Sequence, residues 1–125
     1  MYVSPIINQP QPSYGSLLTK LFKRGKLKDV KYGLYGRKLT SDNVTDEHVI
    51  PRSKGGPDDI GNLALATKSN NSSRGNRPLS DYLTDENLSR YTRQFEDINY
   101  PQYNFNGKSY IRKLLRSIAK ALGMK

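Results

Sequence analysis

The residues best suited to chemistry lie between positions 45 and 78, around the single histidine of the chain. The stretch reads TDEHVIPRSKGGPDDIGNLALATKSNNSSRGNRP. An imidazole has an ordinary pKa of about 6.5, so His48 can accept a proton from water near neutral pH. The carboxylate of Glu47, directly before it, is a hard oxygen ligand of the kind that Mg²⁺ and Mn²⁺ prefer. The pair is therefore suited to metal-assisted hydrolysis.

Two short apolar runs around a turn-rich loop are expected to present these residues. We expect a strand over residues 44–50, ended by Pro51, and a second strand over residues 62–66. Glycine and proline mark residues 52–61 as the loop between them. Because successive side chains of a regular strand point to opposite faces, the acid and the histidine share a site only where the strand is bulged or ends. The proline favours an ending.

An Asn-rich and Arg-rich segment follows the second run. We expect a short helix from Asn70 onward, limited by a glycine and a proline. Basic side chains on both sides of the second strand are suited to clamping phosphate groups, with ordinary surface charge as the alternative interpretation. These side chains are Arg52, Lys54, Arg74 and Arg77.

The order of these residues resembles a known family. The pattern EHVIPRSKGG, then Asn62, then Asn71 nine residues later, resembles the HNH nucleases, in particular phage and homing endonucleases. The resemblance covers roughly residues 30–79. It implies a small ββα-metal core. Together with the flanking helices and the extended N-terminal arm that the rest of the sequence predicts, this gives an α+β fold. The resemblance also implies a metal-dependent endonuclease that hydrolyses DNA phosphodiester bonds.

The resemblance assigns a separate role to each motif position. Glu47 takes the position of a metal ligand, and His48 that of the general base that deprotonates the attacking water. Asn62 takes the position that holds the loop and orients the histidine. Asn71 takes the position of the second metal ligand, through its side-chain carbonyl oxygen.

Two alternatives stay open within this assignment. Asn70 is the alternative to its neighbour as second ligand, and Asp46 is a weaker alternative to Glu47. The implied cofactor is a divalent ion, Mg²⁺ or Mn²⁺. The implied products carry 5′-phosphate and 3′-hydroxyl ends.

The sequence departs from one common pattern of this family. Many HNH proteins carry two cysteine pairs that bind a structural zinc ion. The corresponding positions here hold Tyr32, Tyr35, Thr67 and Asn70, and the chain has no cysteine. We therefore expect no structural zinc, and we expect tyrosine packing and hydrogen bonds to take its place.

The charge of the chain indicates its partner. Lys and Arg number 21 against 11 Asp and Glu, a formal net charge of +10. Such an excess favours a polyanion, and with the motif we expect double-stranded DNA. Residues 20–38 hold eight Lys or Arg with interleaved tyrosines, which suits a strip along a phosphate backbone. On the last helix, Arg112 and Arg116 are expected to contact DNA.

The chain is expected to divide into three segments. Residues 1–15, with three prolines, read as an extended arm; residues 16–79 hold the basic strip and the nuclease core; residues 80–125 form a helical extension. We expect helices over residues 85–98 and 109–122. The apolar stripe of the last helix is expected to be Ile111, Leu114, Leu115, Ile118 and Leu122.

Composition also limits the cellular setting. No apolar run approaches the ~20 residues needed to cross a membrane. The first residues lack the basic start and apolar centre of a signal peptide, so we expect a cytoplasmic protein of a bacterium or a phage-infected cell.

Two further functional hypotheses remain at this level. One is a nucleic-acid-binding protein that keeps the fold without turnover. The other, weaker, is membrane or partner-helix binding through residues 108–125. The sequence leaves open monomer or homodimer, and nicking or double-strand cleavage.

Overall fold

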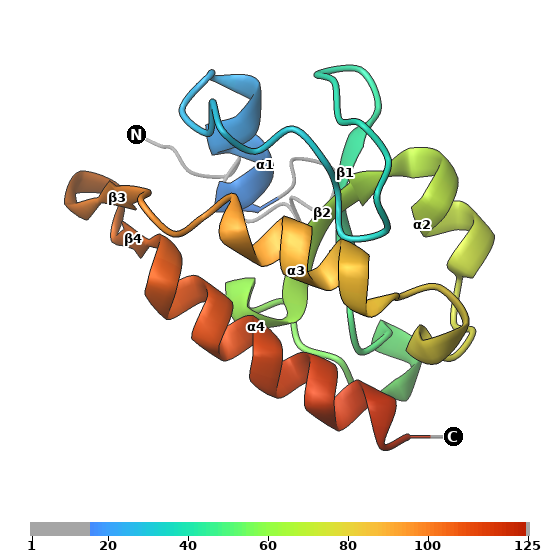
Figure 1. Cartoon of the computed structure of the whole chain (residues 1–125). Coiled ribbons are helices and arrows are strands. Elements are labelled where there is room, and N and C mark those ends of the chain that lie inside the picture. Colours follow the sequence, from blue (N-terminus) through green and yellow to red (C-terminus); the bar gives the residue numbers. More distant parts are fainter. Residues whose placement is uncertain (1–15, 125) are drawn as a thin grey trace, which may run out of the picture.

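The structure, a computed structural model, describes residues 16–124, so the expected arm over residues 1–15 lies outside the described residues. Within these residues, four α-helices and two small antiparallel sheets follow one another (Figure 1), which confirms the α+β prediction. The helices are α1 (Leu17–Lys23), α2 (Lys68–Arg74), α3 (Asp85–Arg93) and α4 (Gly107–Leu122). The strands are β1 (Val44–His48), β2 (Leu63–Thr67), β3 (Asn99–Tyr100) and β4 (Phe105–Asn106).

The central unit is the β1–β2 hairpin with the helix that follows it directly. In the antiparallel register Glu47 pairs with Ala64 and His48 pairs with Leu63. The side chain of Thr67 accepts a hydrogen bond from the backbone N–H of Asn70, which caps α2 where β2 ends. Strand, strand and helix therefore form one continuous ββα unit.

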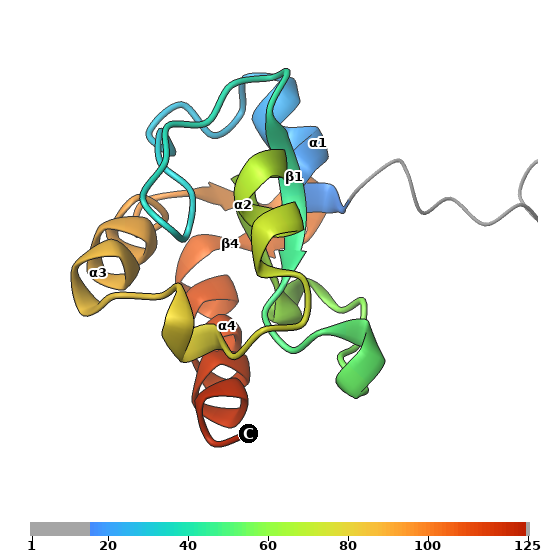
Figure 2. The same ribbon diagram turned by 90° about the vertical axis from the view of Figure 1, so that its right-hand side faces the viewer.

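Helices α1 and α2 lie against opposite faces of this hairpin (Figure 2). On one face the carboxylate of Asp46 accepts hydrogen bonds from the backbone and hydroxyl of Ser16 and from Thr19, both at the start of α1. On the other face Glu47 pairs with Arg74 at the end of α2. The alternation of side chains along β1 thus joins the hairpin to a different helix on each side.

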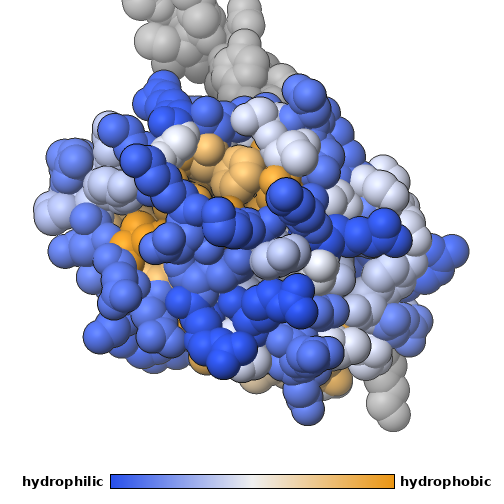
Figure 3. Space-filling model, turned by 45° about the horizontal axis from the view of Figure 1, so that its top comes forward, coloured by the Kyte–Doolittle hydropathy of each residue, from blue (hydrophilic) through white to orange (hydrophobic). Residues whose placement is uncertain are grey.

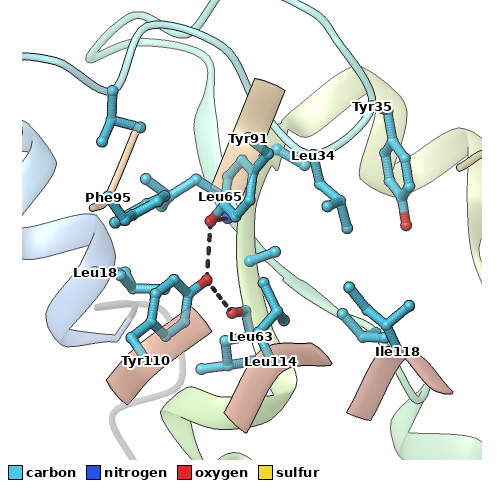
Figure 4. Packing of buried hydrophobic residues seen from close by; sticks show 14 of the residues in the cluster. Leu18, Leu34, Tyr35, Leu63, Leu65, Tyr91, Phe95, Tyr110, Leu114 and Ile118 are labelled. Atoms are coloured by element: carbon cyan, nitrogen blue, oxygen red, sulfur yellow. Dashed lines mark hydrogen bonds between the residues drawn. The ribbon is translucent and has the colours of Figure 1, made fainter. Parts of the chain in front are cut away.

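Two tyrosine hydroxyls form hydrogen bonds with backbone groups at the outer edge of β2. A two-stranded sheet leaves one row of N–H and C=O groups of each strand without a strand partner, and such groups need one when they are buried. The N–H of Leu65 donates to the hydroxyl of Tyr91, and the hydroxyl of Tyr110 donates to the carbonyl of Leu63. The two hydroxyls also bond each other at 2.9 Å (Figure 4). Helices α3 and α4 thereby take the place of a third strand.

The strand boundaries differ by one or two residues from the expected ones. β1 ends at His48 instead of residue 50, because the N–H of Ile50 bonds the side-chain oxygen of Asn62 in place of a backbone partner. β2 runs from Leu63 to Thr67, one residue later than expected.

The helix boundaries shift as well. α3 ends at Arg93, short of the expected residue 98. α4 begins two residues early, because the side chain of Asn106 accepts a hydrogen bond from the N–H of Ser109 and caps it.

The predicted buried stripe of α4 was wrong in two positions. Leu115 is 42% exposed and Leu122 is 50% exposed. The buried face instead contains Tyr110, Leu114, Ile118 and Ala121, which recur at helical spacing. The prediction counted every leucine as buried and left out Tyr110, so the predicted face was rotated away from the observed one. A buried tyrosine with a hydrogen-bonded hydroxyl is not evident from hydropathy.

One hydrophobic core draws residues from Leu18 in α1 to Ala121 in α4. The surface of the molecule is mostly hydrophilic on the face seen in Figure 3, with small apolar areas between hydrophilic side chains. Within residues 16–124, no helix is both long and apolar enough to cross a bilayer.

Candidate active site

Glu47 lies in a buried ion pair beneath α2. Its side chain is 2% exposed, as is that of Arg74, whose Nη1 lies 2.9 Å from Oε2 of the carboxylate. The hydroxyl of Tyr35 donates to the same oxygen. Burial raises the pKa of Glu47, opposed by hydrogen bonds from the tyrosine and the guanidinium. Burial likewise raises the pKa of Tyr35, and the neighbouring carboxylate adds to the rise.

Arg74 joins the end of α2 to the end of β1. Nη1 donates to the carbonyl of His48 at 3.1 Å, and Nη2 donates to the carbonyl of Val49 at 3.0 Å. Nε donates to the carbonyl of Arg77 at 2.9 Å. Burial acts to lower the pKa of Arg74, but the hydrogen bond and charge of Glu47 outweigh it and the pKa is raised. The guanidinium is therefore charged, and all three of its nitrogens donate to groups of the protein. Because the side chain is buried, it has no exposed surface for the expected phosphate contact.

His48 turns toward the loop rather than toward Glu47. Its side chain is 21% exposed, and its Nε2 lies 2.8 Å from Oδ1 of Asp58. Nε of Arg52 lies 3.1 Å from the same oxygen. The hydrogen bond from His48 and the hydrogen bond and charge of Arg52 lower the pKa of Asp58. The sequence reasoning missed Asp58; the one available signal was a pair of acids ten residues after the histidine, directly after the Gly-Gly-Pro turn.

Asn62 closes the loop between the two strands. The side chain is 1% exposed. Its amide nitrogen donates to the carbonyls of Ile50 and Pro57, both at 3.0 Å, and its amide oxygen accepts from the N–H of Ile50 at 2.9 Å. The backbone carbonyl accepts from the N–H of Val49 at 2.9 Å. Asn62 therefore fixes the chain that directly follows His48.

The two candidate ligands on α2 share the face that carries Arg74. Asn71 and Asn70 lie three and four residues before Arg74, the helical spacings that place side chains on one face. Both are half-buried, and within the described range neither side-chain amide has a hydrogen-bond partner. Asp46, the alternative to Glu47, lies on the opposite face of the hairpin, where α1 engages its carboxylate.

The donor chemistry at this face fits a hard cation. Oε2 of Glu47 is engaged, but within residues 16–124 no donor bonds Oε1, although the carboxyl group is buried. A carboxylate oxygen and an amide oxygen from Asn71 are ligands suited to Mg²⁺ or Mn²⁺. The positive charge of Arg74 on the same carboxylate opposes such an ion. Over the described part of the chain there is no group of three or more His, Cys, Asp or Glu able to hold a metal.

Hydrogen bonds hold the segment around Tyr32 in place. The side chain of Gln94 accepts from the N–H groups of Lys31 and Tyr32 and donates to the carbonyl of Tyr32. The N–H of Leu34 donates to the carbonyl of Leu65 in β2 at 2.9 Å. Residues 31–34 are thus tied to the C-terminal end of α3 and to the central hairpin.

The remaining basic candidates lie on the surface around the loop. Arg52, Arg77, Arg112 and Arg116 are exposed and Lys54 is half-buried. Arg116 and Lys113 line a cleft of about 430 Å³ between α4 and loop residues 57–62.

Close packing fixes the position of this cleft. The hydroxyl of Ser117 donates to the carbonyl of Gly61 at 2.8 Å. A Cβ at position 61 would come within 2.9 Å of the Lys113 Cβ, so the absence of a side chain allows this approach. Helix α4 therefore holds its basic side chains beside the loop that carries the partner of His48.

The segment is a β-hairpin that continues into a helix, with a histidine at the end of its first strand. Residues 35–77 match the family model described as HNH endonuclease. This match confirms, for that segment, the resemblance to the HNH nucleases found in the sequence. This supports nuclease-type activity, nucleic-acid binding and the use of divalent metal at the level of the family. Comparisons with curated proteins and with solved structures gave no significant match.

Proposed function

We propose that this protein is a divalent-metal-dependent endonuclease that hydrolyses phosphodiester bonds of double-stranded DNA. The observation that carries the proposal is the position of His48. It stands at the end of β1 within the segment matched to HNH endonucleases, partly exposed, with Asp58 bonded to its ring. The net charge of +10 supplies the attraction to a polyanion.

In this proposal the general base is His48, which takes a proton from the attacking water. General-base catalysis is typically worth ~10²–10⁴-fold in rate. The hydrogen bond from Arg74 to the carbonyl of His48 fixes the backbone at the base. Asn62 fixes the loop opposite. Both act through packing and hydrogen bonds, without touching the substrate.

Glu47, through Oε1, and Asn71, through its amide oxygen, would hold the divalent ion, with Asn70 as the alternative to Asn71. When bound, such an ion supplies charge neutralisation at the phosphate and at the leaving 3′-oxygen. The expected product ends are a 5′-phosphate and a 3′-hydroxyl. Arg74 has a different role from the one expected for it: it positions Glu47 and the end of β1.

The DNA backbone would follow the basic side chains around the loop and along α4. Arg52 and Lys54 lie in the loop after β1, Arg77 follows α2, and Arg112 and Arg116 lie on α4. Arg116 stands at the cleft beside residues 57–62, the loop segment that contains Asp58, the partner of His48. These contacts are with phosphate, so they supply affinity rather than sequence preference.

The experiment is a supercoiled-plasmid assay with Mg²⁺, Mn²⁺ or excess chelator. We expect nicked plasmid with either ion and none with chelator. Treatment of the nicked product with DNA ligase tests the chemistry, because ligase reseals only a 5′-phosphate beside a 3′-hydroxyl. Absence of nicking with every divalent ion contradicts the proposal, and nicks that ligase cannot reseal contradict the assigned products.

A second candidate is a nucleic-acid-binding protein without turnover. It is favoured by one observation, the full burial of Glu47 against the guanidinium of Arg74. The guanidinium of Arg74 already pairs with one carboxylate oxygen of Glu47, the expected metal ligand. DNA binding that is unchanged by chelator, together with no cleavage under any divalent ion, supports this candidate over the nuclease.

A further inference from the structure

The ring of His48 has a carboxylate partner that the HNH motif residues do not include. Nε2 lies 2.8 Å from Oδ1 of Asp58. An ionised carboxylate only accepts hydrogen bonds, so a bond at this distance requires a proton on Nε2. We propose that Asp58 is a positioning residue that holds neutral His48 in its Nε2–H tautomer and leaves Nδ1 as the proton-accepting atom. The catalytic consequence rests on the proposed nuclease function, whereas the tautomer does not.

Asp58 is held ionised by its surroundings. Its side chain is 72% exposed to solvent, and Nε of Arg52 donates to the same oxygen at 3.1 Å. The hydrogen bond from His48 and the contact with Arg52 both lower the pKa of the carboxyl group. The acceptor-only form is therefore the relevant one at neutral pH.

The loop that carries Asp58 is anchored on both sides of this residue by Asn62. The side-chain amide of Asn62 donates to the carbonyl of Pro57, directly before Asp58. The backbone N–H of Asn62 donates to the carbonyl of Asp59, directly after it, at 2.8 Å. An exposed carboxylate is thus carried on a rigid backbone. The buried Asn62 reaches the histidine through Asp58, rather than by a bond to the ring.

The opposite ring atom is left available. Among residues 16–124, no group bonds Nδ1 of His48, while its carbonyl is bonded by Arg74. Both the backbone and one ring nitrogen are therefore fixed. Loss of the carboxylate that orients a metal-ligating histidine typically costs about 10–100-fold, and we take the same magnitude for this histidine.

The single histidine gives a direct test by NMR. In ¹⁵N-labelled protein, the two ring nitrogens produce one pair of signals, recorded well above the ordinary imidazole pKa of about 6.5. We expect the wild type to show a protonated Nε2, an unprotonated Nδ1 and a hydrogen-bonded Nε2–H proton. In Asp58→Ala we expect loss of that proton signal and a mixture of tautomers. The matched control, Asp59→Asn, makes the same change of charge one residue later and should retain the wild-type signals. A wild type protonated on Nδ1, or identical signals in Asp58→Ala, overturns the proposal.

Plasmid nicking separates this inference from the proposed function. We expect about 10–100-fold slower nicking by Asp58→Ala at saturating DNA, with undiminished DNA affinity, and no loss in Asp59→Asn. Full nicking activity in Asp58→Ala overturns the positioning role even where the tautomer changes. A wild type with the expected tautomer but no nicking contradicts the nuclease proposal and leaves the tautomer assignment standing.

Discussion

Replacement of Arg74 by methionine is expected to destabilise the fold strongly. Arg74 and Glu47 are each 2% exposed, and their closest atoms are 2.9 Å apart. The substitution keeps an aliphatic side chain at the site but leaves the Glu47 carboxylate buried with only the hydroxyl of Tyr35 beside it. The carbonyls of His48, Val49 and Arg77 also lose their donor.

The magnitude follows from these contacts. Removal of one partner of a buried ion pair typically costs about 3–5 kcal/mol, because the remaining charge stays buried. The freed carbonyls place this site toward the upper end of that range. The stability lost in Arg74→Met should be smaller in acid. Burial raises the pKa of Glu47 in the folded state, so below its unfolded value of about 4.3 the group is neutral in both states and imposes no penalty.

Urea unfolding of four proteins measures this effect. The set is wild type, Arg74→Met, Glu47→Gln and the double variant, followed by circular dichroism at neutral pH and near pH 4. We expect the double variant to lose less stability than the sum of the two single variants. Arg112→Met is the matched control, because its side chain is exposed; it should change stability by no more than about 0.5 kcal/mol. A loss below about 1 kcal/mol in Arg74→Met, or strict additivity, refutes the buried pair.

Three further outcomes follow. Burial raises the pKa of Tyr91 and of Tyr110 above about 10 in the folded state, so stability is complete below that pH and falls above it. Each tyrosine contributes about 1.4 kcal/mol per pH unit, and Tyr110→Phe should reduce the slope in urea titrations at stepped pH. Asn62→Ala should cost about 1–3 kcal/mol by the same titrations, because the N–H of Ile50 loses its acceptor. Exchange of both Lys113 and Arg116 for glutamine should lower the slope of log Kd for DNA against log salt by about 2, measured by fluorescence anisotropy.

Local features of the sequence predicted the elements well. Ser16 and Thr84 are of the residue types that favour helix N-caps, and both side chains accept hydrogen bonds from backbone N–H groups of the following turn. Turn residues and short apolar runs likewise placed both strands of the hairpin to within two residues. These predictions succeeded because caps, turns and alternation depend on neighbours in sequence.

The partners of the site residues depend on tertiary contacts and were not evident. From the sequence, Arg74 was interpreted as a phosphate-clamping side chain. Nothing in its flanking residues shows that α2 directs it onto Glu47. Asp58 read as part of a solvated loop, because its contact with His48 spans ten residues of loop whose path Asn62 sets. The tyrosine hydroxyls at the edge of β2 were also missed, since they join residues 19 to 47 positions apart.

The most direct test of the central claim is the nicking rate of supercoiled plasmid by His48→Ala relative to wild type, with enzyme in excess and Mg²⁺ or Mn²⁺ present. DNA affinity measured in parallel shows that the variant still binds. The general-base assignment predicts a loss of ~10²-fold or more in rate with affinity retained. Equal rates in the two proteins, or no divalent-ion-dependent nicking by the wild type, would contradict it.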